Sequence, residues 1–211
     1  MSSGPETRQR GARLPRSARR KQLLGAAQEV FVANGYHAAA MDDIAERAGV
    51  SKPVLYQHFP GKLELYLALL DEHADDLVTR LREALAATTD NKLRVQGCIR
   101  AYFDFVADGG SGSAGAFRLV FESDLRIEPA VAARVERMVD DCVEAVAETI
   151  AQDTGVAPDA ARLLSRGIIG TAEISARWWL QQGTAVPKDE AERLIAALVW
   201  RGIASFPRTG E

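Results

Sequence analysis

The sequence predicts an all-α fold of about nine helices. The chain has 211 residues, of which 47% are hydrophobic and 7% aromatic, and Ala, Leu, Val, Glu and Arg dominate it, as is typical of helical globular proteins. Apolar residues recur three or four positions apart along most of the chain, which is the spacing of amphipathic helices. One stretch, Met41 to Lys62, also contains the turn residues of a helix-turn-helix.

The composition argues against several classes of protein. No apolar run approaches the roughly 18 residues that a membrane-spanning helix needs, and the basic segment from Met1 to Lys21 lacks the apolar part of a signal peptide. We therefore expect a cytoplasmic protein with no membrane partner. Cys98 and Cys142 lie in apolar helical contexts, which favours small core residues over a disulfide or a zinc site.

Charge is distributed unevenly along the chain, although the net charge is only −3. Up to Lys62 there are ten Lys and Arg against five Asp and Glu, whereas the remainder has 16 against 24. A basic first third joined to an acidic remainder indicates that only the first third contacts a polyanion.

Residues 1–16 form a basic arm whose four arginines stand among Ser, Gly, Pro and Gln, and we expect this arm to be disordered in the free protein. Two interpretations stay open: the arm lies along phosphates or in a minor groove, or it is a solvated terminus. The first helix is then predicted within the stretch from Ser17 to Tyr36, where Asn34-Gly35 supplies the left-handed residues that end it. Arg19 and Arg20 lie near its start, where the helix dipole does not stabilise a cation, so phosphate contact explains them better.

The stretch from Met41 to Lys62 completes a helix-turn-helix DNA-binding domain over residues 17–62. Gly49 ends its first helix in the left-handed conformation, Ser51 is placed to cap the second helix, and Pro53 fits the first turn. The exposed amides of the second helix can then face phosphate. The outward side of that helix carries Tyr56 and His58, for which the alternative is an ordinary surface pair; His37 and His73 are expected to be plain surface residues.

Residues 63–211 are expected to form a C-terminal helical domain for ligand binding and dimerisation. A long helix from Lys62 keeps one apolar stripe for about seven turns, and Asp90-Asn91 starts a helix with a wide aromatic face, which either packs on several sides or lines an apolar cavity. The segment Gly109–Gly115, GGSGSAG, is either a solvated connector or a mobile gate. Further helices follow, first a short one that includes Phe117 and Phe121 and then one that begins at Pro129.

The last two predicted helices, residues 158–182 and 188–206, are apolar on more than one side. Small residues in the first of them allow close helix approach, and bulky residues flank them. This pattern favours a homodimer interface over burial within one chain. The interface residues we predict are Trp178, Trp179, Leu194, Leu198 and Trp200.

The string GVSKPVLYQHFPGKLELY resembles the signature of the tetracycline-repressor (TetR) family of bacterial transcription regulators, and the resemblance extends over the whole chain in length and layout. It implies contacts with double-stranded DNA at a pseudo-palindromic operator from Ser51, Lys52, Val54, Tyr56, His58 and Lys62. The chain departs from the family at Ala40-Met41, where a capping Thr is usual. We expect another residue, Asp42 being one candidate, to cap this helix.

Within that family, VSKPVLYQHFPGKLELYLALL, GYHAA, ATTDN and FRLVFESD are similar to the FasR type, which regulates fatty-acid synthase genes and responds to long-chain acyl-CoA. This resemblance implies an apolar tunnel for a long-chain acyl-CoA or fatty acid. The residues implied along its wall are Leu77, Leu85, Tyr102, Phe105, Phe117 and Phe121.

The favoured function is therefore a ligand-responsive, homodimeric transcription regulator that is associated with the nucleoid when bound to DNA. No nucleophile-base pair, paired carboxylates or metal-ligand spacing is found, so we expect neither catalysis nor a metal or cofactor. One alternative is a multidrug-responsive repressor of an efflux gene, with the same fold. Another is a lipid-binding or enzymatic helical protein with a vestigial helix-turn-helix.

Overall fold

The computed structural model describes residues 14–108, 124–182 and 185–203, which are helical apart from short connections and contain no strand. The helices are α1 (Arg16–Ala38), α2 (Met41–Arg47), α3 (Lys52–His58), α4 (Lys62–Ala86), α5 (Asn91–Asp108), the 3-10 helix η1 (Asp124–Ile127), α7 (Pro129–Thr154), α8 (Pro158–Gln181) and α9 (Lys188–Ile203). The predicted all-α fold is confirmed, and the helix count is close to the predicted nine. The Gly109–Gly115 segment, Phe117 and Phe121 lie outside the described residues.

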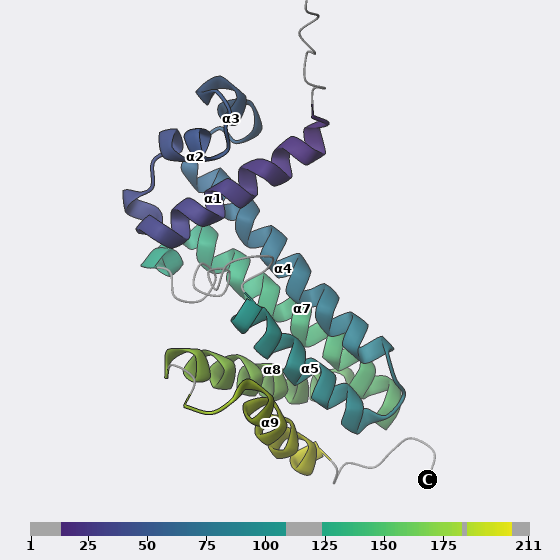
Figure 1. Cartoon of the computed structure of the whole chain (residues 1–211). Helices are drawn as coiled ribbons and strands as arrows, with labels where there is room; N and C mark the ends of the chain where they lie inside the picture. The colour runs from purple at the N-terminus through teal and green to yellow at the C-terminus, as the bar shows by residue number, and fades with distance from the viewer. Residues whose placement is uncertain (1–13, 109–123, 183–184, 204–211) are drawn as a thin grey trace, which may run out of the picture.

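Three long helices, α4, α5 and α7, run side by side and form the middle of the molecule (Figure 1). Helices α1 to α3 lie at one end of α4, whereas α8 and α9 pack toward the other end of the bundle. Since α4 carries buried residues along its whole length, from Leu65 to Leu85, one continuous core joins the two ends.

Local sequence signals fix several helix ends. Gly35 has a φ of 74° and interrupts α1 where Asn34-Gly35 was predicted to stop it, although a further turn follows. The Asp90 carboxylate accepts hydrogen bonds from the amides of Lys92 (2.8 Å) and Leu93 (3.1 Å), which caps α5 as expected. Gly155, with a φ of 67°, ends α7 in the left-handed conformation.

The predicted surface position of His73 is wrong, because its side chain is only 6% exposed. His73 stands between Leu69 and Leu77 on the buried side of α4, at a spacing of four residues. The position therefore continues the apolar stripe of the helix, and its ring lies edge-on to Phe105 at 6.5 Å between centroids.

Candidate nucleic-acid interface and core cavity

Helices α2 and α3 meet at a tight turn in which Gly49 has a φ of 63°. The amide of Gly49 donates to the carbonyl of Glu46 (2.9 Å), and that of Val50 donates to Ala45 (3.0 Å), so the backbone itself fixes the angle between the helices. Leu55 and Phe59, which are 0% and 2% exposed, anchor α3 to the core. The opposite side of α3 is thereby turned outward, and Tyr56 is 47% exposed there.

The caps at the starts of α2 and α3 differ from the prediction in two details. Asp43, and not Asp42, caps α2, since its carboxylate accepts from the amide of Ala40 at 3.3 Å. The alanine offers no acceptor in return, so the reciprocal half of a capping box is missing. Ser51 is the N-cap of α3, yet its hydroxyl makes no capping hydrogen bond. The expected Ser51 cap is therefore corrected to a backbone cap, in which its carbonyl accepts from Val54 at 3.0 Å.

The predicted DNA contacts come from three elements at the same end of the molecule: the start of α1, the whole of α3 and the start of α4 (Figure 1). Arg20, Ser51, Lys52 and Tyr56 are exposed, whereas Arg19, Val54, His58 and Lys62 are partly buried. The guanidinium of Arg20 lies over the ring of Phe59 at 4.6 Å, which joins the first helix to the end of α3.

The electrostatics of His58 support this proximity. Its pKa is lowered from 6.5 by partial burial first, and then by the charges of Arg16, Arg20 and Arg19. Those three arginines belong to the first turns of α1, so the start of α1 and the end of α3 present their cations to a common region. A phosphate placed there would favour protonated His58.

Two lysines of the predicted interface have partners inside the chain. The ammonium of Lys52 pairs with the carboxylate of Asp42 at 2.5 Å, and both side chains are more than half exposed. The ammonium of Lys62 instead donates to the carbonyls of Tyr36 (2.8 Å), His37 (3.2 Å) and Ala39 (2.8 Å), and lies 4.6 Å from the centre of the Tyr36 ring. Lys62 thus binds the end of α1, which is a role that the sequence did not predict.

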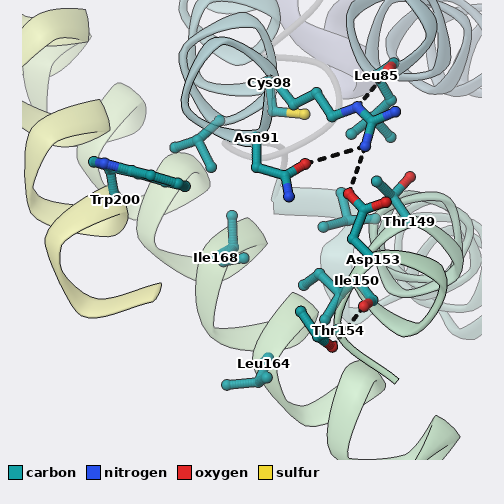
Figure 2. A pocket seen from close by; sticks show the side chains of 13 residues that line it. Leu85, Asn91, Cys98, Thr149, Ile150, Asp153, Thr154, Leu164, Ile168 and Trp200 are labelled. Atoms are coloured by element: carbon teal, nitrogen blue, oxygen red, sulfur yellow. Dashed lines mark hydrogen bonds and ion pairs between the residues drawn. The ribbon is translucent and has the colours of Figure 1, made fainter. Parts of the chain in front are cut away.

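A cavity of about 110 Å³ lies at the other end of the bundle, between the ends of α4, α5 and α7 and the helices α8 and α9. Apolar side chains form most of its wall, with Trp200 across the cavity from Asp153 (Figure 2). Polar groups gather on one side, where Arg94 donates to Asn91 (3.1 Å) and pairs with Asp153 (2.5 Å). The same guanidinium binds the carbonyls of Leu85 (3.0 Å) and Thr88 (2.8 Å), so it is held rigidly.

The predicted ligand residues differ in their relation to this cavity. Leu85 lines it, whereas Leu77, Tyr102 and Phe105 are buried in the core beyond it at no more than 1% exposure. Sequence reasoning missed the polar residues Asn91, Arg94, Thr149 and Asp153. They come from two helices that are far apart in the sequence, and no local sequence pattern indicates that these residues lie close together in the fold.

The predicted dimer residues separate into two groups. Trp178, Leu194 and Leu198 are 58%, 50% and 65% exposed, and together with Ile174 they leave an apolar face on α8 and α9. Trp179 is only 7% exposed, packs on Phe103 and donates its indole N–H to the carbonyl of Val186 at 2.7 Å. Of the predicted interface residues, Trp179 therefore packs into the core of the protomer, and Trp200 is partly buried and lines the cavity.

Within the described parts of the chain, no helix is long and apolar enough to cross a membrane. The same ranges contain no group of three or more His, Cys, Asp or Glu arranged for a metal ion.

Comparisons with known proteins agree with this geometry. Residues 23–69 match the family described as bacterial regulatory proteins, tetR family. The chain is 48% identical to the HTH-type transcriptional activator FasR of Mycolicibacterium smegmatis over 95% of this chain and 90% of that protein. Among solved structures, it is similar to a tetR-family regulator from Streptomyces coelicolor, with 28% identity, a TM-score of 0.71 and coverage of 90% and 82% of the two chains. It also has the fold of FadR from Bacillus subtilis, solved in complex with stearoyl-CoA, with 21% identity, a TM-score of 0.68 and coverage of 87% and 98%.

Proposed function

Because the chain belongs to the TetR family of bacterial regulatory proteins and is a DNA-binding transcriptional regulator of that type, we propose that a long-chain acyl-CoA in its C-terminal helices sets its affinity for an operator. In this proposal residues 17–62 bind DNA, with residues 1–16 as a basic arm, and residues 63–211 bind the ligand and dimerise. The similarity to FasR along nearly the whole chain, and not only along the DNA-binding part, is the observation that carries the ligand assignment.

The DNA-binding surface that we propose consists of the start of α1, the outward side of α3 and the start of α4. Two copies of α3 would enter successive major grooves of a pseudo-palindromic operator, as a two-fold dimer requires. Exposed Tyr56 and Lys52 stand on the outward side of α3, and His58 stands among the arginines of α1. These placements support contacts with phosphates and base edges. The residues assigned to DNA contact are Arg19, Arg20, Ser51, Lys52, Val54, Tyr56, His58 and Lys62.

The ligand would lie between α4, α5 and α7, where the cavity and the buried residues Leu77, Leu85, Tyr102 and Phe105 are found. A FadR of the same fold holds stearoyl-CoA, which supports the capacity of this architecture for an acyl chain. Ligand changes DNA affinity only if it binds one arrangement of the two DNA-binding ends better than another. Helix α4 starts beside the DNA-binding surface and ends at the cavity, so we propose it as the lever.

The DNA-binding part is tested by selecting genomic fragments with the full chain and measuring affinity against salt. We expect a specific site whose affinity falls steeply with salt. The variant Tyr56→Phe should weaken binding to that site without changing the circular dichroism spectrum. Absence of any preferred fragment, or a flat salt dependence, would remove the regulator function and favour a vestigial helix-turn-helix.

The ligand part is tested by thermal-shift measurements with stearoyl-CoA and with cationic dyes. We expect the acyl-CoA to raise the unfolding temperature and to change operator affinity, and the dyes to do neither. Stabilisation by dyes alone would contradict the proposal and support a multidrug-responsive repressor.

A further inference from the structure

The C-terminal core contains two buried polar atoms that have no hydrogen-bond partner among the described residues: Nε2 of His73 on α4 and the hydroxyl oxygen of Tyr102 on α5. The two side chains are 6% and 0% exposed. An oxygen of Glu192 shares this lack of a hydrogen bond but lies 3.3 Å from the ammonium of Lys188, so it is ion-paired. Buried polar groups without partners are rare because they cost stability, so the His73 and Tyr102 atoms need an explanation.

Both side chains lie in the seam where α5 and α7 pack on α4. The His73 ring contacts Phe105 edge-on, and Phe105 follows Tyr102 by three residues on the same side of α5. At about 1.5 Å per residue, Tyr102 and Phe105 lie about 4.5 Å apart along the helix axis. The histidine and the tyrosine therefore stand at neighbouring levels of this seam, with His73 against Phe105 of α5 and the Tyr102 hydroxyl beside Cys142 of α7.

The seam begins where the cavity ends. Cys98 lines the cavity, and Tyr102 follows it by four residues on α5. Val146 also lines the cavity, and Cys142 precedes it by four residues on α7. The Tyr102 hydroxyl interacts with the Cys142 thiol, but a thiol forms only weak hydrogen bonds, so the hydroxyl keeps the capacity for a stronger partner. The inner end of the cavity thus lies one helical turn from a hydroxyl group that has only this weak partner.

The chemistry of the seam favours a neutral ligand group. Burial lowers the pKa of His73 to about 4 and raises that of Tyr102 well above its usual value, so both side chains are neutral at pH 7. The charged groups that act on them, Asp76 and Glu173, are acidic. A carboxylate would find no opposite charge there, whereas a neutral oxygen can accept a hydrogen bond from Tyr102 and, as a hydroxyl, serve either tautomer of His73.

We infer that His73 and Tyr102 form an internal polar site for a hydroxyl or oxo group carried on the apolar chain of the effector. This inference rests on the proposed function, because it places an acyl chain in the bundle. In this arrangement the acyl chain continues from the inner end of the cavity, at Cys98 on α5, into the seam. The oxygen would then meet Tyr102 and His73 at a fixed distance from the cavity end of the chain.

The test compares stearoyl-CoA with a series of hydroxystearoyl-CoA and oxostearoyl-CoA isomers that differ in the position of the oxygen. Affinity for the full chain is measured by isothermal titration calorimetry. We expect one position to bind about tenfold more tightly than stearoyl-CoA, as one or two neutral hydrogen bonds provide. We expect Tyr102→Phe and His73→Leu each to bring the ratio between the affinities for the preferred isomer and for stearoyl-CoA close to one, where both affinities are measured on the same variant.

Tyr66→Phe is the matched control, since Tyr66 is 1% exposed but packs against Phe31 and Tyr36 at the DNA-binding end. The same loss of a hydroxyl there should leave the preference for oxygenated chains unchanged. Equal affinity of the wild type for stearoyl-CoA and every isomer would overturn the inference while sparing the proposed function. So would an unchanged preference in Tyr102→Phe, which would assign the hydroxyl to an internal water. Failure of all the acyl-CoAs to bind the wild type would instead remove the proposed effector.

Discussion

The two ends of the molecule differ in how far their polar and apolar groups find partners within one chain. At the DNA-binding end three cations have partners within the chain: Lys52 pairs with Asp42, Arg47 with Glu29, and Lys62, at the start of α4, with the carbonyls of α1. Among the described residues of α4 to α9, an apolar face is exposed outside, and Nε2 of His73 and the hydroxyl of Tyr102 lack a strong hydrogen bond inside. Under the proposed function, the DNA-binding end is preformed within one chain, whereas a second copy covers the exposed apolar face and a ligand contacts the buried polar atoms.

This difference matches what each end has to recognise. DNA presents the same phosphates whatever the state of the cell, so a preformed surface serves it and costs little reorganisation. A regulatory domain has to exist in two states whose balance a ligand shifts. Buried polar groups without hydrogen bonds cost free energy, and a ligand that bonds to them removes this cost. A ligand that does so in only one of the two states therefore binds that state more tightly.

We expect the largest effect from a charge placed on the exposed apolar face of α8 and α9, which tests whether this face binds a second copy. Leu198→Glu on α9 would bury a carboxylate in each copy of a two-fold interface, and we expect self-association to weaken by at least about 100-fold. Sedimentation velocity measures the loss, and operator binding should fail with it. Ile127→Glu is the control, since Ile127 is 91% exposed on η1 at the other end of the molecule. A dimeric Leu198→Glu protein would show that this face has another purpose.

At the DNA-binding end, removing Lys62 tests whether the surface is held together from within. Lys62→Ala leaves three carbonyls at the end of α1 without their cation, and we expect the free energy of unfolding in urea to fall by about 2 kcal/mol. Lys52→Ala removes an exposed lysine from the same surface and should leave stability nearly unchanged. If Lys62→Ala and Lys52→Ala have the same free energy of unfolding, Lys62 has no structural role. Contact with phosphate would then explain its presence at this position.

How far the sequence predicts these features depends on how local their causes are. The turn at Gly49 and the cap at Asp90 were predictable, because the residues that form them lie within a few positions of one another. The partners of Lys62 lie 23 to 26 positions away, and nothing in the sequence indicates that the end of α1 returns to the start of α4. The FasR-like strings pointed to Leu85, but the arginine and aspartate beside it in the cavity wall meet only in the folded chain.

His73 illustrates a second limit, which is that the sequence does not show how wide the buried side of a helix is. The predicted stripe of α4 passed through Leu70, Ala74 and Leu77, and a histidine beside such a stripe is usually a surface residue. The folded helix is covered on a wider side, which includes positions 69, 73 and 77. A buried histidine in a long apolar helix is therefore recognised only when its neighbours in space are known.

Acid should weaken the C-terminal end through His73. Its pKa is about 4 in the folded protein against 6.5 in the unfolded chain, so the unfolded chain takes up the proton first as the pH falls. Stability is then fully present above pH 6.5 and declines toward pH 4, by roughly 1.5 kcal/mol between pH 6.5 and pH 5. Urea unfolding of His73→Leu should lack this loss, whereas Leu77→Ala, on the same buried stripe, should be less stable at every pH with the slope retained. Equal slopes in the wild type and His73→Leu would contradict the assignment.

The smallest effect concerns the ion pair between Lys52 and Asp42, which tests how complete the DNA-binding end is. An exposed pair holds its partners weakly, so a phosphate can take Lys52 from Asp42, but the carboxylate still competes. We expect Asp42→Asn to raise operator affinity by about twofold to threefold at low salt, and Lys52→Ala to reduce the salt slope by about one. In a double-mutant cycle the gain from Asp42→Asn should vanish when Lys52 is absent. A gain that persists without Lys52 would mean that Asp42 repels the phosphates directly, and the pair would then have no part in preparing the surface for DNA.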